Sequence, residues 1–135
     1  MSEPLFILPW PPSVNVYWRS LCFGGRSRVV ISEAGNKYRV DVQAAVLQRF
    51  STPFKPIAGK IAVHIEACQP NHLRRDLDNL LKAPLDALTH ARVWNDDSQI
   101  SRLSIEWGPI RKPGEVRVSI DRVVDPEQPS LFGGA

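Results

Sequence analysis

The chain has 135 residues, a length typical of one domain and sufficient to bury a core without disulfides or a structural metal. Seventeen lysines and arginines against fourteen aspartates and glutamates give a formal net charge of +3, which weakly favours a polyanionic partner. Two cysteines are too few for a disulfide scaffold, and we find no signal peptide and no membrane-spanning apolar run. We therefore expect a soluble cytoplasmic protein.

The first thirty residues predict a short strand followed by a β-hairpin. An apolar strand at 5–8 ends at Pro9, and two more prolines then enforce an extended turn. Residues 17–19 and 28–31 predict the two sides of a hairpin around Gly24-Gly25.

Basic and aromatic residues interleave in this hairpin, a pattern typical of surfaces that follow a phosphate backbone and exposed bases. The basic residues are Arg19, Arg26 and Arg28. A half-buried hairpin explains the aromatic residues equally well. We therefore predict the arginines, and not the rings, as nucleic-acid contacts.

A helix and a strand come next. Ser32 predicts the cap of a helix over residues 33–50, which we interpret as scaffold. After a proline-rich loop, residues 59–69 alternate, with the apolar side chains of Ile61, Val63, Ile65 and Ala67 on one face. This predicted strand ends at Pro70 and leads into the acidic part of the chain.

Carboxylates concentrate in two short segments. Asp76 and Asp78 are two residues apart, so their side chains point the same way in an extended segment. From Asp78 onward, leucines at spacings of four, four and three predict a helix, with Asp78, Lys82 and Asp86 on the opposite stripe. Asp96 and Asp97 fall in the turn after this helix, where the chain can fold back toward the helix start. Such a cluster suits Mg²⁺, which takes oxygen ligands and shares them with substrate phosphates.

Ordinary structural roles would also explain these residues. Their spacing alone does not decide between a metal site and a structural role. Asp78 and Lys82 fit an ordinary helical i, i+4 ion pair. Asp78 or Asn79 fits a helix N-cap, and Asp96-Asp97 fits a solvated turn. Pro84 lacks a backbone donor, so it puts the geometry of the first helical turns in doubt.

The C-terminal part predicts a second hairpin and then a tail. Residues 100–107 and 115–121 alternate around a turn at Lys112-Pro113-Gly114, with Leu103, Ile105 and Trp107 facing the second strand. The pattern predicts an α+β fold, a two-layer sandwich of a mixed β-sheet with two main helices on one face. We expect a domain over residues 1–122 and a flexible tail over 123–135.

The acidic segments also carry a resemblance. The order and spacing of three motifs resemble the RusA family of Holliday junction resolvases, over most of residues 5–121. The motifs are Leu8-Pro9-Trp10-Pro11-Pro12-Ser13-Val14-Asn15, Arg74-Arg75-Asp76-Leu77-Asp78-Asn79-Leu80-Leu81-Lys82 and Trp94-Asn95-Asp96-Asp97.

The resemblance implies a Mg²⁺-dependent endonuclease that resolves four-way DNA junctions in recombination and repair, with Mn²⁺ expected to substitute. By position it implies Asp76, Asp78 and Asp97 as metal ligands, with Asp96 as a substitute or support, and Lys82 as a catalytic residue. We expect Arg74 and Arg75 to position the DNA backbone. Two matched cuts on a two-fold substrate imply a homodimer in a bacterial or phage setting. Glu66 and Asp86 have no assigned role.

Two other functions remain open. One is a metal-dependent nuclease for flaps or other branched DNA, and the other is a junction-binding protein without cleavage. The tail adds a separate hypothesis, because Gln128-Pro129-Ser130-Leu131-Phe132 resembles the Gln-x-x-Leu-Phe peptide that binds the bacterial sliding clamp. Packing of Leu131 and Phe132 onto the domain is an equal alternative.

Overall fold

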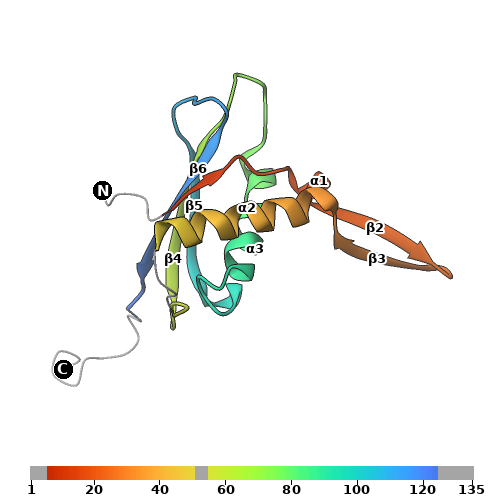
Figure 1. The fold of residues 1–135 in the computed structure, drawn as a ribbon, viewed down its shortest axis with the longest axis horizontal. Helices are drawn as coiled ribbons and strands as arrows, with labels where there is room; N and C mark the ends of the chain where they lie inside the picture. Colours follow the sequence, from red (N-terminus) through yellow and green to blue (C-terminus); the bar gives the residue numbers. More distant parts are fainter. Residues whose placement is uncertain (1–5, 51–54, 125–135) are drawn as a thin grey trace.

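The computed structural model of the chain describes residues 6–50 and 55–124. Figure 1 shows a body of sheet and helices from which a two-stranded hairpin projects. In chain order the elements are β1 (Phe6–Pro9), α1 (Val14–Tyr17), β2 (Trp18–Phe23), β3 (Arg26–Ile31), α2 (Glu33–Arg49), β4 (Ile61–Cys68), the 3₁₀ turn η1 (Leu77–Leu80), α3 (Lys82–His90), the 3₁₀ turn η2 (Asp97–Gln99), β5 (Ile100–Trp107) and β6 (Glu115–Arg122).

A four-stranded mixed sheet with the order β1-β6-β4-β5 forms one layer of the body. β4 pairs antiparallel with β6 and parallel with β5, and β1 pairs antiparallel with β6. A parallel pair needs a crossover connection, and η1, α3 and η2 supply it between β4 and β5. The segments with the predicted carboxylates therefore lie on one crossover.

The predicted hairpin between residues 100–107 and 115–121 is wrong. Both strands form, but β4 lies between them and pairs with each. Alternation of apolar and polar residues sets which face a strand presents, and it carries no information about the neighbouring strand. β4 pairs along both of its edges and, with β6, is one of the two inner strands of the described sheet.

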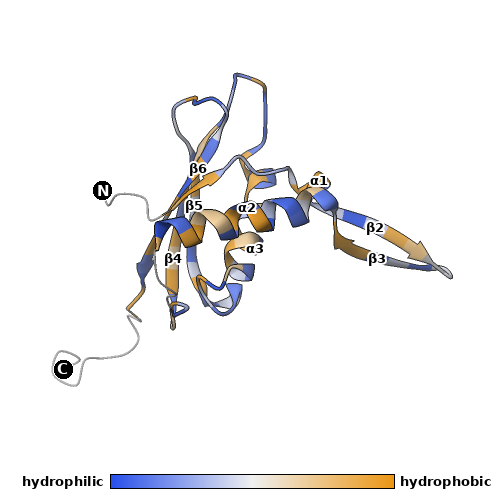
Figure 2. Ribbon diagram, in the orientation of Figure 1, coloured by the Kyte–Doolittle hydropathy of each residue, from blue (hydrophilic) through white to orange (hydrophobic). Residues whose placement is uncertain are grey.

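Helices α2 and α3 cover one face of the sheet, which confirms the predicted α+β fold with its mixed sheet. Figure 2 shows apolar residues where the helices meet the sheet. The face of β4 predicted to be apolar is buried there, together with residues of β1, β6, α2 and α3; the core includes Leu8, Val42, Val46, Ile61, Val63, Ile65, Ala67, Leu88, Trp94, Val116 and Val118. The core thus holds the crossover firmly against the sheet.

The hairpin of β2 and β3, which we call the arm (residues 18–31), confirms the first predicted hairpin. A short helix, α1, precedes it and was not predicted. At the base of the arm, the Ser32 backbone N–H and hydroxyl donate to the Tyr17 carbonyl oxygen over 3.0 and 2.9 Å. Gly35 packs so closely here that a Cβ atom would lie 2.6 Å from both Ile31 Cγ1 and the Tyr17 oxygen.

Ser32 caps α2 as predicted, because its side chain accepts a hydrogen bond from the Gly35 N–H. The helix predicted from Asp78 differs from the structure: η1 comes first, and α3 begins at Lys82. Pro84 lies in the first turn of α3, where a backbone N–H has no acceptor within the helix, so proline is tolerated. Helix geometry therefore starts one turn later than the leucine spacing indicates.

Among the described helices, none is both long enough and apolar enough to cross a membrane.

Candidate functional site

The first acidic segment exposes two carboxylates. Asp76 has an extended backbone and precedes η1, Asp78 lies within η1, and both are exposed. Neither caps a helix with its side chain: the residues at the cap positions of η1 and α3 are Asp76 and Leu81, and neither makes a side-chain cap bond. Within residues 6–50 and 55–124, neither carboxylate has a hydrogen bond or ion pair.

Lys82 is the first residue of α3, and its side chain is exposed. It makes no ion pair with Asp78 in the described part of the chain. The predicted alternatives of a simple i, i+4 pair and an N-cap are therefore wrong. One exposed lysine and two exposed carboxylates thus lie within seven residues of chain, and none of the three has a side-chain partner among the described residues. All three are available to a ligand.

The two aspartates of the second acidic segment have different roles. Asp96 caps η2: its carboxylate accepts from the Ser98 N–H at 3.2 Å, and the Gln99 side chain accepts from the Asp96 N–H at 2.9 Å. Asp97 is exposed, and its carboxylate has no partner among the described residues. A carboxylate already used as a cap has less capacity for a cation, so the geometry favours Asp97 over Asp96 as a ligand.

The structure does not gather the three predicted ligands into one cluster. Within the described ranges, no group of three or more His, Cys, Asp or Glu side chains is close enough to hold a metal ion. The cause lies in the topology, because Asp76 follows β4 whereas Asp97 precedes β5, and the two strands are parallel. η1 contacts β5 and η2 contacts α3, so both turns pack within one unit. The assignment of Asp97 stays a prediction.

A cleft of about 290 Å³ adjoins Asp76. Its walls combine the acidic segment with the segment after β1, and they consist of Trp10, Pro11, Ser13, Arg74, Arg75, Asp76, Asn79 and Leu80. Two of the predicted DNA-contacting arginines, Arg74 and Arg75, thus lie directly beside a predicted metal ligand. A phosphate backbone that reached these arginines would also reach Asp76.

Arg75 and Arg74 differ in how firmly they are held. Arg75 Nη1 donates to Asn71 Oδ1 at 2.9 Å and to Gln69 Oε1 at 3.1 Å. Its guanidinium also lies 5.5 Å from the centre of the Trp10 ring, which is within cation–π range. Arg74 is exposed and has no partner in the described part of the chain. The guanidinium of Arg75 is therefore held by neighbouring groups, whereas that of Arg74 is held by none of the described residues.

Sequence reasoning missed Trp10, Ser13 and Asn79 as neighbours of the site. The available signal was the resemblance of the segment Leu8–Asn15 to the family, which predicted no role for individual residues. Asn79 lies only three residues after Asp76 in the chain. The return of the chain after β4 to the start of α1 brings Trp10 and Ser13 beside Asp76, as the contact of η1 with α1 shows.

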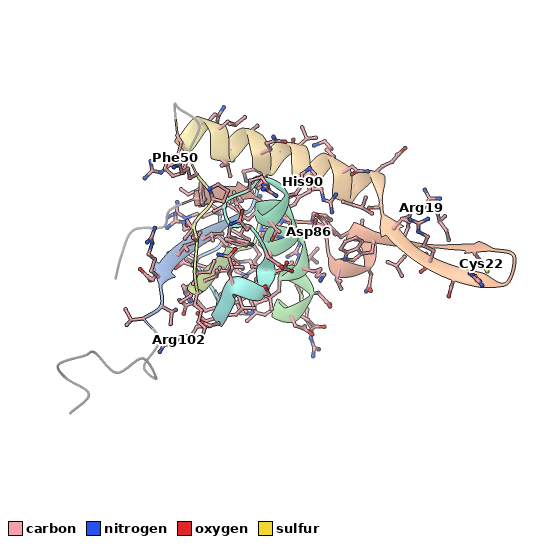
Figure 3. All side chains as sticks on the ribbon, turned by 90° about the horizontal axis from the view of Figure 1, so that it is seen from below. Arg19, Cys22, Phe50, Asp86, His90 and Arg102 are labelled. Atoms are coloured by element: carbon pink, nitrogen blue, oxygen red, sulfur yellow. The ribbon has the colours of Figure 1, made fainter. Side chains whose placement is uncertain are left out.

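Asp86, left without a role by the sequence, joins three helices. Arg39 of α2 donates to its carboxylate from Nε at 2.8 Å and from Nη2 at 3.2 Å, and the hydroxyl of Tyr17 in α1 donates to Asp86 Oδ2. Burial, and then the hydrogen bond to Asp86, raise the pKa of Tyr17 well above its usual value. Figure 3 shows Asp86 in the middle of the body, between α3 and α2.

The predicted DNA-contacting arginines of the arm, Arg19, Arg26 and Arg28, are all exposed, and none has a partner among the described residues. Figure 3 shows Arg19 on the arm, away from the body. Tyr17, however, is fully buried, and Trp18 is half-buried against it with ring centres 5.1 Å apart. These two rings build the base of the arm, which fits the choice of arginines over aromatic residues.

Glu66 lies on the sheet face that the helices leave uncovered. Its carboxylate is 3.8 Å from Arg117 Nη1, and the Cys68 thiol donates to it at 3.6 Å. Burial, and then this contact with Glu66, raise the pKa of the Cys68 thiol. These contacts connect Glu66 with Arg117 and Cys68 on that face.

Comparison with known proteins identifies the class to which this chain belongs. The family model described as "Endodeoxyribonuclease RusA" matches residues 9–121. A crossover junction endodeoxyribonuclease of Enterobacteria phage HK97 is 40% identical over 114 residues, covering 84% of this chain and 89% of the relative.

A protein of the same description from Escherichia coli K12 is 38% identical over 120 residues, covering 89% and 95%. Another, from Enterobacteria phage 82, is 39% identical over 113 residues, covering 84% and 89%. The chain belongs to the RusA family of endodeoxyribonucleases, and the resemblance seen in its motifs is confirmed. The match ends before the tail, so residues 122–135 lie outside it.

Proposed function

We propose that this protein is a Mg²⁺-dependent endonuclease that resolves four-way (Holliday) DNA junctions by paired symmetric nicks, in recombination and repair in the bacterial cytoplasm. Relatives over most of the chain are crossover junction endodeoxyribonucleases. The observation that carries the proposal is the pair of exposed carboxylates without partners, Asp76 and Asp78, beside a cleft lined by Arg74 and Arg75. Asp86, in contrast, is paired with Arg39 and Tyr17.

Asp76, Asp78 and Asp97 are the residues that would hold the metal. They fit it chemically, because hard oxygen donors without other partners are what Mg²⁺ takes, together with waters and substrate phosphates. A bound Mg²⁺ supplies Lewis acidity for phosphodiester hydrolysis and lowers the pKa of water. One described chain does not bring Asp97 to the other two aspartates. The set of three metal ligands is therefore completed only in the assembled protein bound to DNA.

The cationic residues divide into two roles. Lys82, one turn after Asp78, places positive charge where charge develops on the phosphate in the transition state. Arg74, Arg75 and the arm arginines contact the DNA backbone and set its position. Exposed cations at both the cleft and the arm suit a branched substrate, whose arms leave the crossover in different directions.

A homodimer is part of the proposal. A junction has near two-fold symmetry and needs two cuts, so two symmetry-related sites serve it. One chain supplies one set of the proposed metal ligands, Asp76, Asp78 and Asp97, and therefore one site.

Cleavage assays test the function directly. The purified protein is incubated with a four-way junction, a flap and a linear duplex, each with Mg²⁺, with Mn²⁺ and with a chelator. We expect metal-dependent nicks at symmetric positions in the junction alone. Preferential cutting of flaps supports the alternative nuclease, and tight junction binding with no cutting under any metal condition supports a non-catalytic protein.

The ligand set has its own test. Asp97→Asn and Asp76→Asn should each abolish cutting while leaving junction affinity within about a factor of three, because affinity rests on phosphate contacts by cations. Asp96→Asn, which alters the cap of η2, should lose less activity than Asp97→Asn. The reverse order would assign the third ligand to Asp96.

The tail hypothesis concerns Gln128, Leu131 and Phe132, which lie outside the described residues. We propose that this segment binds the bacterial sliding clamp as a linear peptide, with two large apolar side chains entering a pocket. Replacing Leu131 and Phe132 together by alanine should abolish clamp binding in a titration with labelled protein and leave cleavage of free junctions unchanged. Unchanged clamp binding would end the hypothesis.

A further inference from the structure

Two side-chain amides hold one end of the Arg75 guanidinium. Arg75 Nη1 donates to Asn71 Oδ1 at 2.9 Å and to Gln69 Oε1 at 3.1 Å, and the Leu73 carbonyl oxygen lies 3.4 Å from the same nitrogen. The Nη1 group carries two hydrogens, so the two shorter bonds use both of them. This end of the guanidinium is therefore fixed within the loop between β4 and η1.

The residues that supply these amides are themselves restrained. Asn71 Oδ1 also accepts from the Leu73 N–H at 3.1 Å, the local turn that asparagine makes with the backbone two residues on. The backbone oxygen of Gln69 accepts from the Arg111 N–H at 3.0 Å, which ties this loop to the loop between β5 and β6. Figure 1 shows both loops beyond the same end of the sheet. Contacts other than Arg75 thus restrain both amide residues.

Trp10 supports the face of the same guanidinium, with 5.5 Å between Arg75 Cζ and the centre of the ring. Trp10 is itself tightly packed, because a Cβ atom on Gly114 would lie 3.0 Å from Trp10 Cβ. The backbone just before it is also held, since the Tyr38 hydroxyl donates to the Pro9 carbonyl oxygen at 2.8 Å. Arg75 is therefore restrained at one end by amides and on one face by an indole ring.

The other donors of this guanidinium are available to a ligand. Nε and Nη2 of Arg75 have no acceptor within residues 6–50 and 55–124. In the planar group the Nε–H and one N–H of Nη2 point the same way, and this fork matches two oxygens of a phosphate. Arg75 lines the cleft together with Asp76. The edge that stays open is therefore the one suited to bind a phosphate beside a proposed metal ligand.

We propose that Trp10, Gln69 and Asn71 are positioning residues for junction cleavage. They act through Arg75: they hold one end and one face of its guanidinium, so that the Nε–Nη2 fork binds a phosphate of the cut strand at a set distance from the metal. The inference rests on the proposed function, and it names the residues that orient one of its DNA contacts. In this role none of the three residues has to touch the DNA.

The charge of Arg75 and its orientation affect different quantities. Junction affinity depends mainly on how many phosphates are neutralised, and Arg75 keeps its charge when its support is removed. The cleavage step depends on where the phosphate lies, because a displacement of about 1 Å can lower a rate by about a hundredfold. Loss of the support should therefore slow cleavage and leave affinity and its salt dependence nearly unchanged.

Single variants of the full chain test the support. Trp10→Leu, Gln69→Leu and Asn71→Ala remove it, so single-turnover cleavage of a four-way junction should slow by about tenfold or more in each. Trp10→Phe keeps an aromatic face and should recover most of the rate. Junction affinity should stay within about threefold of wild type in all four, with an unchanged salt slope. Asn36→Ala and Trp107→Leu, at exposed positions of α2 and β5, are the matched controls and should alter neither quantity.

A double-mutant cycle tests whether these residues act through Arg75. Arg75→Lys keeps the positive charge and lacks the planar fork. Adding Asn71→Ala or Trp10→Leu to Arg75→Lys should slow cleavage by about twofold at most, because the group that they position is gone. Equal losses in the wild-type and Arg75→Lys backgrounds would overturn the inference, and so would a fall in affinity that matches the fall in rate.

Nitrogen-15 NMR of the Arg75 side chain tests the support without DNA, at a temperature where urea unfolding shows every variant to be folded. The two Nη groups give separate signals only when rotation about the Nε–Cζ bond is slow, and Arg75→Lys identifies these signals by removing them. They should be separate in the wild-type chain and merge in Asn71→Ala and Trp10→Leu. Signals that stay separate in both variants would overturn the inference.

The two proposals can fail separately. A chain that cuts junctions at the wild-type rate in all these variants keeps the proposed function and loses the positioning role. A chain that cuts no junction loses the proposed function, and the NMR signals still decide whether Trp10 and Asn71 hold Arg75.

Discussion

Two regions of one short stretch, residues 76–86, use the same residue type in opposite ways. At the acidic turn, Asp76 and Asp78 are exposed and have no partner in the described part of the chain. Two turns later, Asp86 receives two bonds from Arg39 and one from Tyr17. Aspartates of one short stretch thus divide into a pair left free for a ligand and one that is fully engaged.

The difference teaches that partners, and not spacing, decide the role of an acid. Asp86 faces α1 and α2, which pack against α3 and bring Arg39 and Tyr17 to it. Asp78 lies in η1, before α3 begins, where no basic side chain of the described residues bonds to it. Changing each acid should therefore affect a different property of the protein.

Asp78→Asn should give the largest effect, a loss of junction cleavage of at least about a hundredfold, because it removes a ligand oxygen and its charge. The free energy of unfolding should stay within about 0.5 kcal/mol of wild type, since an exposed carboxylate without a partner contributes little. Single-turnover cleavage and urea unfolding measure the two quantities. Asp121→Asn, at an exposed position of β6, is the control and should alter neither.

Lys82→Ala should come next, with a loss of cleavage of about tenfold to a hundredfold and nearly unchanged junction binding. The reason is that its charge acts on the transition state more than on bound DNA. The comparison of single-turnover rate with junction affinity separates the two. A fall in affinity equal to the fall in rate would make Lys82 a binding residue only.

Asp86→Asn should have the opposite effects to Asp78→Asn: it should lower stability and leave cleavage unchanged. Loss of the carboxylate leaves the hydrogen-bonding groups of Arg39 and Tyr17 poorly matched, so unfolding should require about 1–2 kcal/mol less free energy. Cleavage per folded molecule should hold at a temperature where the variant is fully folded. If cleavage falls while stability does not, Asp86 belongs to the site and the contrast between the two regions fails.

The arm arginines should give smaller, salt-dependent effects. Replacing Arg19, Arg26 or Arg28 by glutamine removes one phosphate contact, so the slope of log affinity against log salt should fall by about 0.9. Fluorescence titrations of junction DNA at several salt concentrations measure that slope. Arg122→Gln provides the comparison, and an equal change there would make the arm no different from the general surface.

The smallest effect concerns alkaline pH. Burial raises the pKa of both Tyr17 and Tyr38, so the fold disfavours the phenolate of each. Their contribution to stability is complete below the unfolded value of about 10 and is lost as pH rises toward the folded value. Urea unfolding across that range should show falling stability, and Tyr17→Phe should fall less steeply. An unchanged slope would assign the loss to other groups.

Much of this fold follows from local signals, and the exceptions have a common cause. Ser32, the alternation of β4 and the glycine turn of the arm each act over a few residues, and each prediction is confirmed. The pairing of β5 and β6 was wrong because a strand inserted from earlier in the chain separates them. The late start of α3 reflects Pro84, whose effect depends on its place in the turn.

Prediction of the site from the sequence has the same limit, because only local signals can be read from a single sequence. Motif order predicted Asp76, Asp78 and Lys82 as a unit, and local chain geometry is enough to keep them together. The placement of Trp10 beside Arg75, and of Arg39 beside Asp86, depends on contacts between distant segments, which a single sequence does not encode in any local pattern. The relation of Asp97 to the other acids depends on such contacts as well.

The close packing at Gly35 has a consequence for the arm as a whole. Each strand of the arm has six residues, so the arm extends roughly 20 Å from its base and acts as a lever. A methyl group at Gly35 would press on Ile31 and on the Tyr17 carbonyl, and a small tilt there becomes a large swing at the tip. The hydrogen atom that Gly35 carries in place of a side chain thus sets the direction of the arm and of its arginines.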